Sequence, residues 1–534
     1  MPFCKISDAP AYPLRGFMID VGRNYQSLEL LKEQLDIMAD YKLNTFHWHL
    51  TDRPAWRIES KIYPQLTESS NHRSSRDPGM YYTYEEIREL IAYANDRAIR
   101  VIPEIDMPGH SDSFITSMGF RMESEKGMEA LENILQEFFE EIPYEMAPII
   151  HIGSDEVHIP NPEEFITRMV KKVQSDGREV VVWSPGLKTD SSVIRQSWGA
   201  MDTTNMTKGI KEIDSRKSYI NSGEPMTYVN KIFFKPIMAA PGNEAIGGIL
   251  CLWPDVNLRK GMDAFKENPV YSGLLTFAWA TWTADILAAP QEYWTMMPNK
   301  ETEAADYFSA FEEYLMVHKE GYFKGLPFSY LPQSDKEWRL AGPFNMEEEK
   351  KFLKALEDGA KMDGQDLEWK DARGNTLIIT DRFNLGGYYP EAKPGESVYA
   401  LTYIHSDRDR SVPVWIGFET PMRANRIFTG IAENGSWDIN GGKIWLNDQE
   451  LEGPQWERPG WKPSKQEGWG SKVDQEIPWT VEELYWTRDP AMISLKKGWN
   501  KILVRIPGAT SYQNWMFTFV PLEMDGWKFS PKPE

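Results

Sequence analysis

Cysteine is nearly absent from this chain: Cys4 and Cys251 are the only two in 534 residues. So few cysteines exclude a disulfide framework and a cysteine-based metal site. Cys251 lies within an apolar run, and we expect it in the core. Long apolar runs are missing as well, since no stretch of about 18 apolar residues occurs, which argues against a membrane-spanning helix. The first residues, MPFC, do not resemble a signal peptide.

Positive charge is also scarce. The chain has 59 basic and 80 acidic residues, giving a formal net charge of −21. This balance argues against nucleic acids and anionic membrane surfaces as partners. The length predicts two to three domains rather than a single core. Tryptophan, in contrast, is abundant with 21 residues; most should be buried, although aromatic side chains also hold the apolar faces of sugar rings.

Up to about residue 320, short apolar runs alternate with stretches of helical periodicity. Ser27 and Thr83 are suited to cap two of the helices, with Glu86 completing a capping box. Eight runs with intervening helices predict an α/β fold, a (β/α)₈ TIM barrel, whose active site lies at the C-terminal strand ends. The eight runs are Gly16–Ile19, Leu43–Leu50, Ile99–Ile105, Ile149–Val157, Val180–Trp183, Val193–Trp198, Ser218–Ile220 and Ile246–Trp253.

After about residue 335 the pattern changes to short alternating runs rich in Pro, Gly and Trp. Val414–Phe418, Lys443–Asn447 and Lys501–Ile506 are typical of strands in a β-sandwich. The last two resemble the end of a galactose-binding-like jelly roll. We therefore expect two domains, a catalytic barrel over residues 1–330 and an all-β sandwich over residues 331–534.

The segment His151–Glu156 carries the strongest chemical signal. It follows an apolar strand and places Asp155 and Glu156 side by side, an arrangement that repulsion and desolvation make unfavourable for stability alone. Two carboxylates whose surroundings separate their pKa values supply an acid and a base at neutral pH. An isolated Asp-Glu pair is usually a solvated turn, but polar and aromatic residues fall late in nearly every run: Asp20, His49, Asp52, Asp106, Asp155, Glu156, Trp183, Trp198, Tyr219 and Trp253.

Five ordered motifs connect this pattern to a known family. They are Arg15–Asp20, Asn44–Asp52, Trp56–Glu59, Pro103–His110 and His151–Glu156. Together they resemble glycoside hydrolase family 20 over about 300 residues. That family comprises β-N-acetylhexosaminidases, which use the substrate's own acetamido group in place of an enzyme nucleophile.

The resemblance implies an exo-acting, retaining hydrolase of terminal N-acetylglucosamine. The 2-acetamido oxygen would attack the anomeric carbon and form an oxazolinium ion. Glu156 would act as acid and then base, Asp155 would orient the acetamido N–H, and Tyr219 would donate to the acetamido oxygen. Trp183, Trp198 and Trp253 would wall the sugar pocket.

The resemblance also implies supporting roles. Arg15 would bind two sugar hydroxyls with its guanidinium group, the alternative being a surface salt bridge. Asp106, His110 and His151 could form a relay that sets the protonation of Glu156, the alternative being ordinary buried polar groups. His49 is expected to support the site from the second strand.

Four positions depart from the family pattern. Arg53 follows Asp52 where the family has Asp, Lys188 lies in the segment that usually carries an acidic pair, Asn221 replaces Asp, and Asp255 replaces Glu. These positions are expected near the sugar's 4- and 6-hydroxyls. Fewer carboxylates and an added lysine favour an anionic substituent such as a 6-sulfate, with Lys188 as counter-charge; neutral drift of a loop is the alternative.

Several alternatives stay open. A lacto-N-biosidase within the same family would need a roomier pocket. His47-Trp48-His49 at a strand end could instead belong to a metal-dependent amidohydrolase, and a sugar-binding protein without activity is a third possibility. We expect no cofactor and no metal, a glycan or glycoconjugate as the partner, and a periplasmic, cell-surface or secreted location with the export signal absent from this sequence.

Overall fold

The computed structural model describes residues 7–200, 208–284, 289–359, 362, 365–381, 383–418, 430–461, 483–508, 514–523 and 525–533. The chain divides into two compact units. The first unit comprises Met1–Asn221, Pro236–Phe265 and Leu274–Asp285; the second comprises Ser222–Lys235, Lys266–Gly273 and Ile286–Glu534. A domain division at residue 330 remains a prediction. Within the described ranges, no helix has both the length and the apolar character needed to cross a bilayer.

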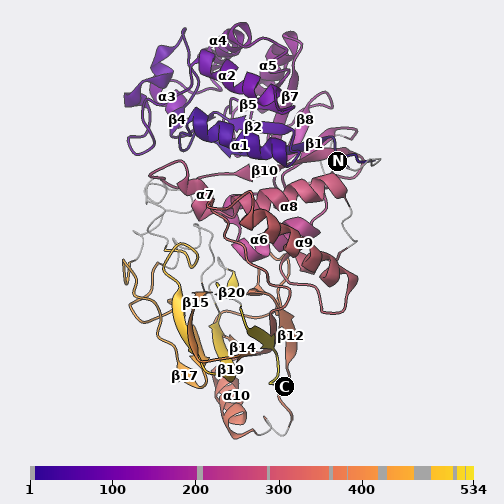
Figure 1. Ribbon diagram of the computed structural model, residues 1–534. Coiled ribbons are helices and arrows are strands. Elements are labelled where there is room, and N and C mark those ends of the chain that lie inside the picture. Colours follow the sequence, from indigo (N-terminus) through magenta and orange to yellow (C-terminus); the bar gives the residue numbers. More distant parts are fainter. Residues whose placement is uncertain are drawn as a thin grey trace. The chain divides into compact units, whose positions relative to one another are not determined.

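The first unit contains a closed barrel of eight parallel strands (Figure 1), which confirms the predicted TIM-barrel fold. The strands close in the order β1-β10-β9-β8-β7-β6-β5-β2. They are β1 (Leu14–Asp20), β2 (Thr45–His49), β5 (Arg100–Glu104), β6 (Ile149–His151), β7 (Glu179–Ser184), β8 (Ile194–Ser197), β9 (Lys211–Asp214) and β10 (Glu244–Leu252). Cys251 on β10 is fully buried, as expected.

Helices follow the strands of the first half of the barrel. Ser27 caps α1, and Thr83 with Glu86 forms the capping box of α2, so both predicted helix starts are confirmed. A small ladder of β3 (Thr51–Asp52) and β4 (Ala55–Trp56) follows β2. The helices are α1 (Leu28–Asp40), α2 (Tyr84–Asn95), α3 (Asp112–Met118), α4 (Glu125–Glu141), α5 (Pro162–Ser175), α6 (Pro225–Phe234), α7 (Asp263–Glu267), α8 (Val270–Thr283) and α9 (Glu303–Glu320).

The seventh predicted strand is wrong. Ser218–Ile220 was expected to form it, but the structure places the strand at Lys211–Asp214, and Tyr219 makes only an isolated bridge to Cys251. Glu212 and Asp214 are buried in β9 because Arg216 pairs with both, at 2.8 and 3.2 Å. Arg216, two residues beyond the end of β9, therefore offsets the negative charge of this strand.

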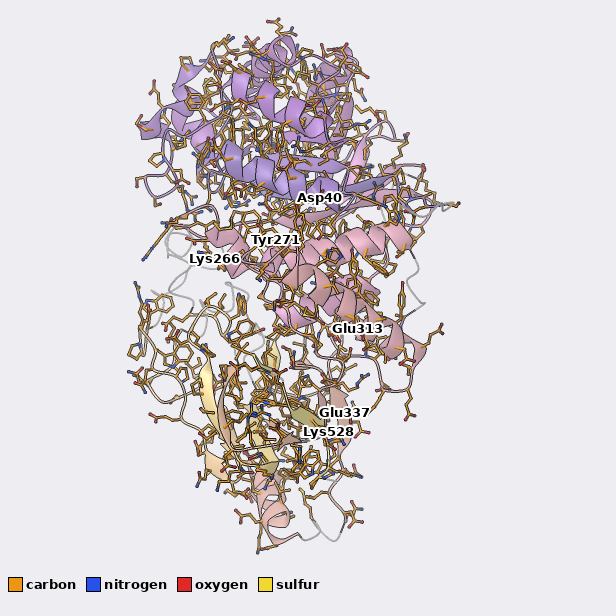
Figure 2. All side chains as sticks on the ribbon, in the orientation of Figure 1. Asp40, Lys266, Tyr271, Glu313, Glu337 and Lys528 are labelled. Carbon is orange, nitrogen blue, oxygen red and sulfur yellow. The ribbon has the colours of Figure 1, made fainter. Side chains whose placement is uncertain are left out.

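The second unit contains an all-β sandwich, which confirms the predicted class for this part of the chain. One sheet has the order β12-β11-β14-β19-β16-β17, with β21 also pairing with β14, and the other has the order β13-β20-β15-β18. Figure 2 labels Glu337 on β11 and Lys528 on β21, two strands that pair with successive parts of β14, β11 over Ser397–Leu401 and β21 over Tyr403–Ser406. The strands are β11 (Glu337–Phe344), β12 (Lys370–Arg373), β13 (Thr376–Thr380), β14 (Ser397–Ser406), β15 (Arg410–Gly417), β16 (Lys443–Leu446), β17 (Gln449–Glu450), β18 (Ala491–Leu495), β19 (Gly498–Pro507), β20 (Trp515–Pro521) and β21 (Trp527–Ser530).

Apolar side chains from both sheets meet in one core. Trp338 and Val398 come from one sheet, and Val414 and Phe517 from the other. Helix α10 (Met346–Asp358) packs its buried Phe352 against Tyr399 of β14, with ring centroids 5.0 Å apart. The sandwich is thus a layered apolar structure, in contrast to the barrel end described next.

Candidate active site

Four neighbouring barrel strands end in ionisable residues that lie in register. Asp20 is paired with His49, His49 with Glu104, and Glu104 with His151, and each is the last residue of its strand. Because the strands are parallel, these residues meet at the C-terminal edge of the barrel, where such folds carry their active sites. All four are at most 1% exposed.

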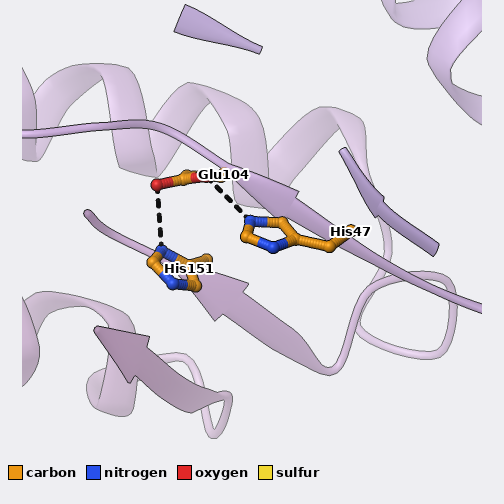
Figure 3. Close-up of side chains that lie close together, drawn as sticks. All are labelled: His47, Glu104 and His151. Carbon is orange, nitrogen blue, oxygen red and sulfur yellow. Dashed lines mark hydrogen bonds and ion pairs between the residues drawn. The ribbon is translucent and has the colours of Figure 1, made fainter. Parts of the chain in front are cut away.

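Glu104 is the hub of this edge. One carboxylate oxygen lies 2.7 Å from His47 Nε2 and 2.5 Å from His49 Nδ1. The other accepts the indole N–H of Trp183 at 2.7 Å and lies 3.2 Å from His151 Nδ1. Figure 3 shows His47 and His151 facing this carboxylate from two strands. Burial alone would raise the pKa of Glu104, but the three histidines hold it well below its usual range.

The turn after β6 presents the acidic pair in an unusual backbone conformation. Gly153, Ser154 and Glu156 all have left-handed φ values, of 65°, 85° and 48°. For residues other than glycine this conformation is costly, and it is found where function requires it. Position 153 accepts only glycine, because an added Cβ would lie 1.7 Å from Asp106 Oδ1.

The two carboxyl groups of this turn have opposite electrostatic surroundings. Burial and the nearby charges of Glu104 and Glu156 raise the pKa of Asp155 to about 7. Contact with His110, whose Nε2 lies 3.4 Å from the carboxylate, lowers the pKa of Glu156. The two pKa values are thus shifted apart, and Asp155 is the more readily protonated residue of the pair.

His110 connects Glu156 to the barrel interior, but through a different partner from the one predicted. Its Nδ1 lies 3.4 Å from Asp52 Oδ2. Burial would lower the pKa of His110, yet Asp52 and Glu156 raise it well above its usual value. Of the predicted relay, His151 contacts Glu104 instead, while Asp106 Oδ1 has no hydrogen-bond partner and burial raises the pKa of this carboxyl group strongly.

Arg23 is a site residue that the sequence reasoning missed. Its guanidinium group lies 2.6 Å from Asp20, 3.0 Å from Asp52 and 3.3 Å from Asp255, and it stacks over the Trp253 ring at 5.0 Å. Burial opposes its charge, but the three carboxylates raise the pKa of Arg23 well above its usual value. Like Asp20, it is a polar residue at the C-terminal end of a barrel strand, and this pattern could have identified it from the sequence.

Arg15 lies elsewhere. It is the second residue of β1, and its guanidinium group donates to the carbonyl oxygens of Tyr12, Pro13 and Lys42. It lies five positions before Asp20, which is about 16 Å along a strand. The structure therefore does not bring Arg15 to the C-terminal edge, where it was expected to bind sugar.

Three of the predicted aromatic residues form a cluster beside the charged groups. Trp253 lies 5.7 Å from Trp183, 5.7 Å from Tyr219 and 4.9 Å from His49 between ring centroids. Trp198 packs against the same apolar cluster, and its indole N–H donates to the Pro185 carbonyl. Burial and nearby carboxylates keep the pKa of Tyr219 well above its usual value, so its hydroxyl remains a donor.

The positions expected to set specificity are less tightly held. Lys188 is exposed on the loop after β7. Asn221 is partly buried and is the middle residue of the short 3₁₀ helix Ile220–Ser222. Asp255 contacts Arg23, and burial raises the pKa of its carboxyl group. Of these three residues, Asp255 is the one that contacts the charged cluster, through Arg23.

Three sets of side chains have a spacing compatible with a metal ion, with ligand atoms within 4.8 Å of one another. Hydrogen bonds and ion pairs within the protein already account for most of these atoms, so we assign none of them as a metal ligand. The sets are His47, Glu104 and His151; His49, Asp52 and Asp106; and Asp106, His110 and Asp155.

Comparison with known proteins finds a match for the first part of the barrel sequence. The model of the glycosyl hydrolase family 20 catalytic domain matches residues 12–127. This stretch, called the family 20 segment below, is similar to the catalytic domain of that family. The family 20 segment covers β1, β2 and β5, and with them Arg23, Asp52, Glu104 and His110.

Curated relatives match this chain over stretches about as long as the family 20 segment. A beta-hexosaminidase of Porphyromonas gingivalis is 52% identical over 114 residues, covering 21% of this chain and 15% of that protein. One of Vibrio furnissii is 46% identical over 130 residues, covering 22% and 21%. The chain thus spans less than a quarter of the length of these two relatives. A solved Streptomyces plicatus beta-hexosaminidase in complex with GlcNAc aligns with 22% identity and a TM-score of 0.49, covering 60% of this chain and 71% of that one.

Proposed function

We propose that this protein is an exo-acting, retaining β-N-acetylhexosaminidase that removes terminal N-acetylglucosamine from glycans. The observation that carries the proposal is the turn after β6, which places the adjacent carboxyl groups of Asp155 and Glu156 beside His110, with His110 Nε2 3.4 Å from Glu156. The family 20 segment, and relatives called beta-hexosaminidases, support the same assignment.

The reaction begins with attack by the substrate on itself. The 2-acetamido oxygen bonds to the anomeric carbon as the glycosidic bond breaks, which forms an oxazolinium ion. Asp155, as carboxylate, accepts the acetamido N–H and balances the positive charge, while the Tyr219 hydroxyl donates to the acetamido oxygen. The half-buried Trp253 and Trp198 and the buried Trp183 limit access of water to the reactive ion.

Proton transfer is assigned to Glu156 and His110. A proton held between His110 Nε2 and Glu156, 3.4 Å apart, passes to the departing glycosidic oxygen. Water then attacks the anomeric carbon and opens the oxazolinium ring, giving its proton to Glu156. The configuration at the anomeric carbon is retained because it is inverted twice.

We assign the binding of the sugar hydroxyls to Arg23 rather than to Arg15. The Arg23 guanidinium group is surrounded by Asp20, Asp52 and Asp255 and lies over the Trp253 ring, so it is fixed beside an aromatic surface. A planar guanidinium group held in this way suits two adjacent hydroxyls. Asp255 adds an acceptor to the same group.

A 6-sulfated N-acetylglucosamine is the finer part of the proposal. Lys188 is an exposed cation four residues beyond the end of β7, on the side of the barrel that carries the aromatic cluster. A flexible exposed lysine contributes little to the binding of a neutral sugar, but can select an anionic one. Such a substrate is part of an extracellular or periplasmic glycan, and we propose export on this basis.

The decisive experiment compares aryl β-N-acetylglucosaminide with the matching β-glucoside, which lacks the acetamido group. We expect hydrolysis of the first alone, and inhibition by a thiazoline mimic of the cyclised intermediate. Equal hydrolysis of both glycosides, or a covalent glycosyl-protein adduct, would contradict the proposal. Loss of activity in chelator would favour the amidohydrolase alternative.

A further inference from the structure

A continuous line of alternating carboxyl and imidazole groups runs from the barrel interior to the acidic turn. Glu104 lies 2.5 Å from His49 Nδ1, and His49 Nε2 lies 3.2 Å from Asp52 Oδ2. The same Asp52 oxygen lies 3.4 Å from His110 Nδ1, and His110 Nε2 lies 3.4 Å from Glu156 Oε2. Glu104 is fully buried at the inner end, while Glu156 is exposed at the outer end.

His49 can satisfy this geometry only as an imidazolium. A neutral imidazole has one N–H and one lone pair, yet both ring nitrogens of His49 face carboxylate oxygens. A lone pair turned toward a buried carboxylate would be repelled by it. Asp52 cannot relieve the conflict by taking a proton, because the same oxygen faces Arg23, which only donates, at 3.0 Å.

Glu104 also faces several polar groups, not all of them donors, since the Nδ1 atom of His151 accepts the Gly153 N–H at 3.0 Å. Its carboxylate contacts His47 and His49 of β2 and faces His151 of β6. It also accepts the indole N–H of Trp183 on β7, a group that can only donate. Its charge also raises the pKa of Asp106, Asp155, Tyr219 and Cys251. A buried carboxylate with this number of polar partners costs desolvation energy that an apolar side chain would avoid, so stability alone does not explain it.

We propose, as an extension of the function proposed above, that Glu104 is a positioning residue for acid catalysis. Its charge holds His49 protonated, and the His49 imidazolium together with Arg23 fixes Asp52 opposite His110. His110 is thereby held in place to share a proton with Glu156. Glu104 acts only through these residues and does not touch the sugar.

The kinetic test separates this role from a general structural one. Glu104→Gln keeps the size of the side chain and removes its charge. We expect kcat/KM for the 4-methylumbelliferyl glycoside to fall about 10- to 100-fold, as when an outer partner of a functional histidine is lost. For the 2,4-dinitrophenyl glycoside, whose leaving group needs no proton, the fall should be below about 3-fold. His49→Gln should show the same selectivity, and serves if Glu104→Gln does not fold.

The matched control is Glu212→Gln. Glu212 is another fully buried barrel carboxylate, paired with Arg216 in β9, and has no contact with the line described above among the described residues. Its loss should lower Tm without changing the ratio between the two substrates. Equal losses on both substrates in Glu104→Gln would overturn the proposal.

A spectroscopic test does not depend on activity. The chain has eight histidines, so selective ring-¹⁵N labelling gives few resonances, and that of His49 is assigned by its loss in His49→Gln. Wild-type His49 should carry protons on both ring nitrogens at pH 7 and lose one in Glu104→Gln. A neutral wild-type His49 overturns the inference even if the enzyme is active, whereas a protonated His49 in a protein inactive on all N-acetylhexosaminides overturns only the proposed function.

Discussion

The two halves of the barrel edge differ in chemistry. Strands β1, β2, β5 and β6 end in Asp20, His49, Glu104 and His151, whereas β7 to β10 bring mainly aromatic, hydroxyl and aliphatic groups, with Asp214 the ionisable exception paired locally to Arg216. The family 20 model matches only within the first half. In the proposed function, proton transfer belongs to the charged half, which also binds the sugar through Arg23 and Asp155, while the aromatic half lines the rest of the pocket.

The largest expected effect comes from Glu156, the outer end of the charged half. Glu156→Gln should lower kcat/KM for substrates with poor leaving groups about 10²- to 10⁴-fold, since proton donation to the leaving oxygen is lost. Activity on the 2,4-dinitrophenyl glycoside should largely survive. Steady-state kinetics on both substrates checks this, and an equal loss on both would remove Glu156 from the acid role.

Asp155→Asn tests the same half in two ways. We expect kcat/KM to fall about 10²- to 10³-fold because the amide cannot balance the developing positive charge. In the wild type, Asp155 must be ionised to act and its pKa is raised to about 7 by burial, so kcat/KM should decline as the pH falls through about 7. That limb should be absent in the variant.

The same carboxyl group should weaken the fold at high pH. Its pKa in the folded protein, about 7, lies above the usual value of 3.8, so the unfolded chain releases this proton first and stability is lost as the pH rises between these values. Asp155→Asn should therefore be stabilised by about 2 to 4 kcal/mol at pH 8 and hardly at all at pH 4. Denaturant titrations at both pH values provide the check; greater stabilisation at pH 4 would reverse the sign.

A paired substitution compares the two ends of β1. Arg23→Gln should raise KM about 10- to 100-fold, the value of one or two charge-assisted hydrogen bonds to sugar hydroxyls. Arg15→Gln, at the opposite end, should lower Tm and leave KM unchanged because its three carbonyl contacts are structural. A large KM change in Arg15→Gln would place the sugar differently.

The smallest effect is expected in the aromatic half. Lys188→Ala should reduce the preference for 6-sulfo over plain N-acetylglucosaminide by up to about 5-fold, since an exposed ion pair contributes at most about 1 kcal/mol. Activity on the plain substrate serves as the internal control. Equal turnover of both substrates by the wild type, unchanged in the variant, would dismiss the sulfate proposal.

Prediction from the sequence succeeded where local pattern and chemistry agreed. The barrel and the two helix caps followed from apolar periodicity and residue order. The seventh strand did not, because Lys211–Asp214 has the polarity of a loop, and its two acidic residues are buried against Arg216 and further hydrogen-bond donors. The partner of His110 was also missed: Asp52 and Asp106 both follow strands, and only the folded geometry decides which one faces the imidazole.

The glycine at position 153 has a consequence for how this protein can change. A single methyl group there would overlap a carboxylate oxygen of Asp106, so the main chain that carries the acidic pair has no room for even the smallest ordinary side chain. Natural variation and laboratory libraries should both leave this position untouched while the neighbouring loops diverge. The backbone of the acidic turn thus requires a residue without a Cβ atom at position 153.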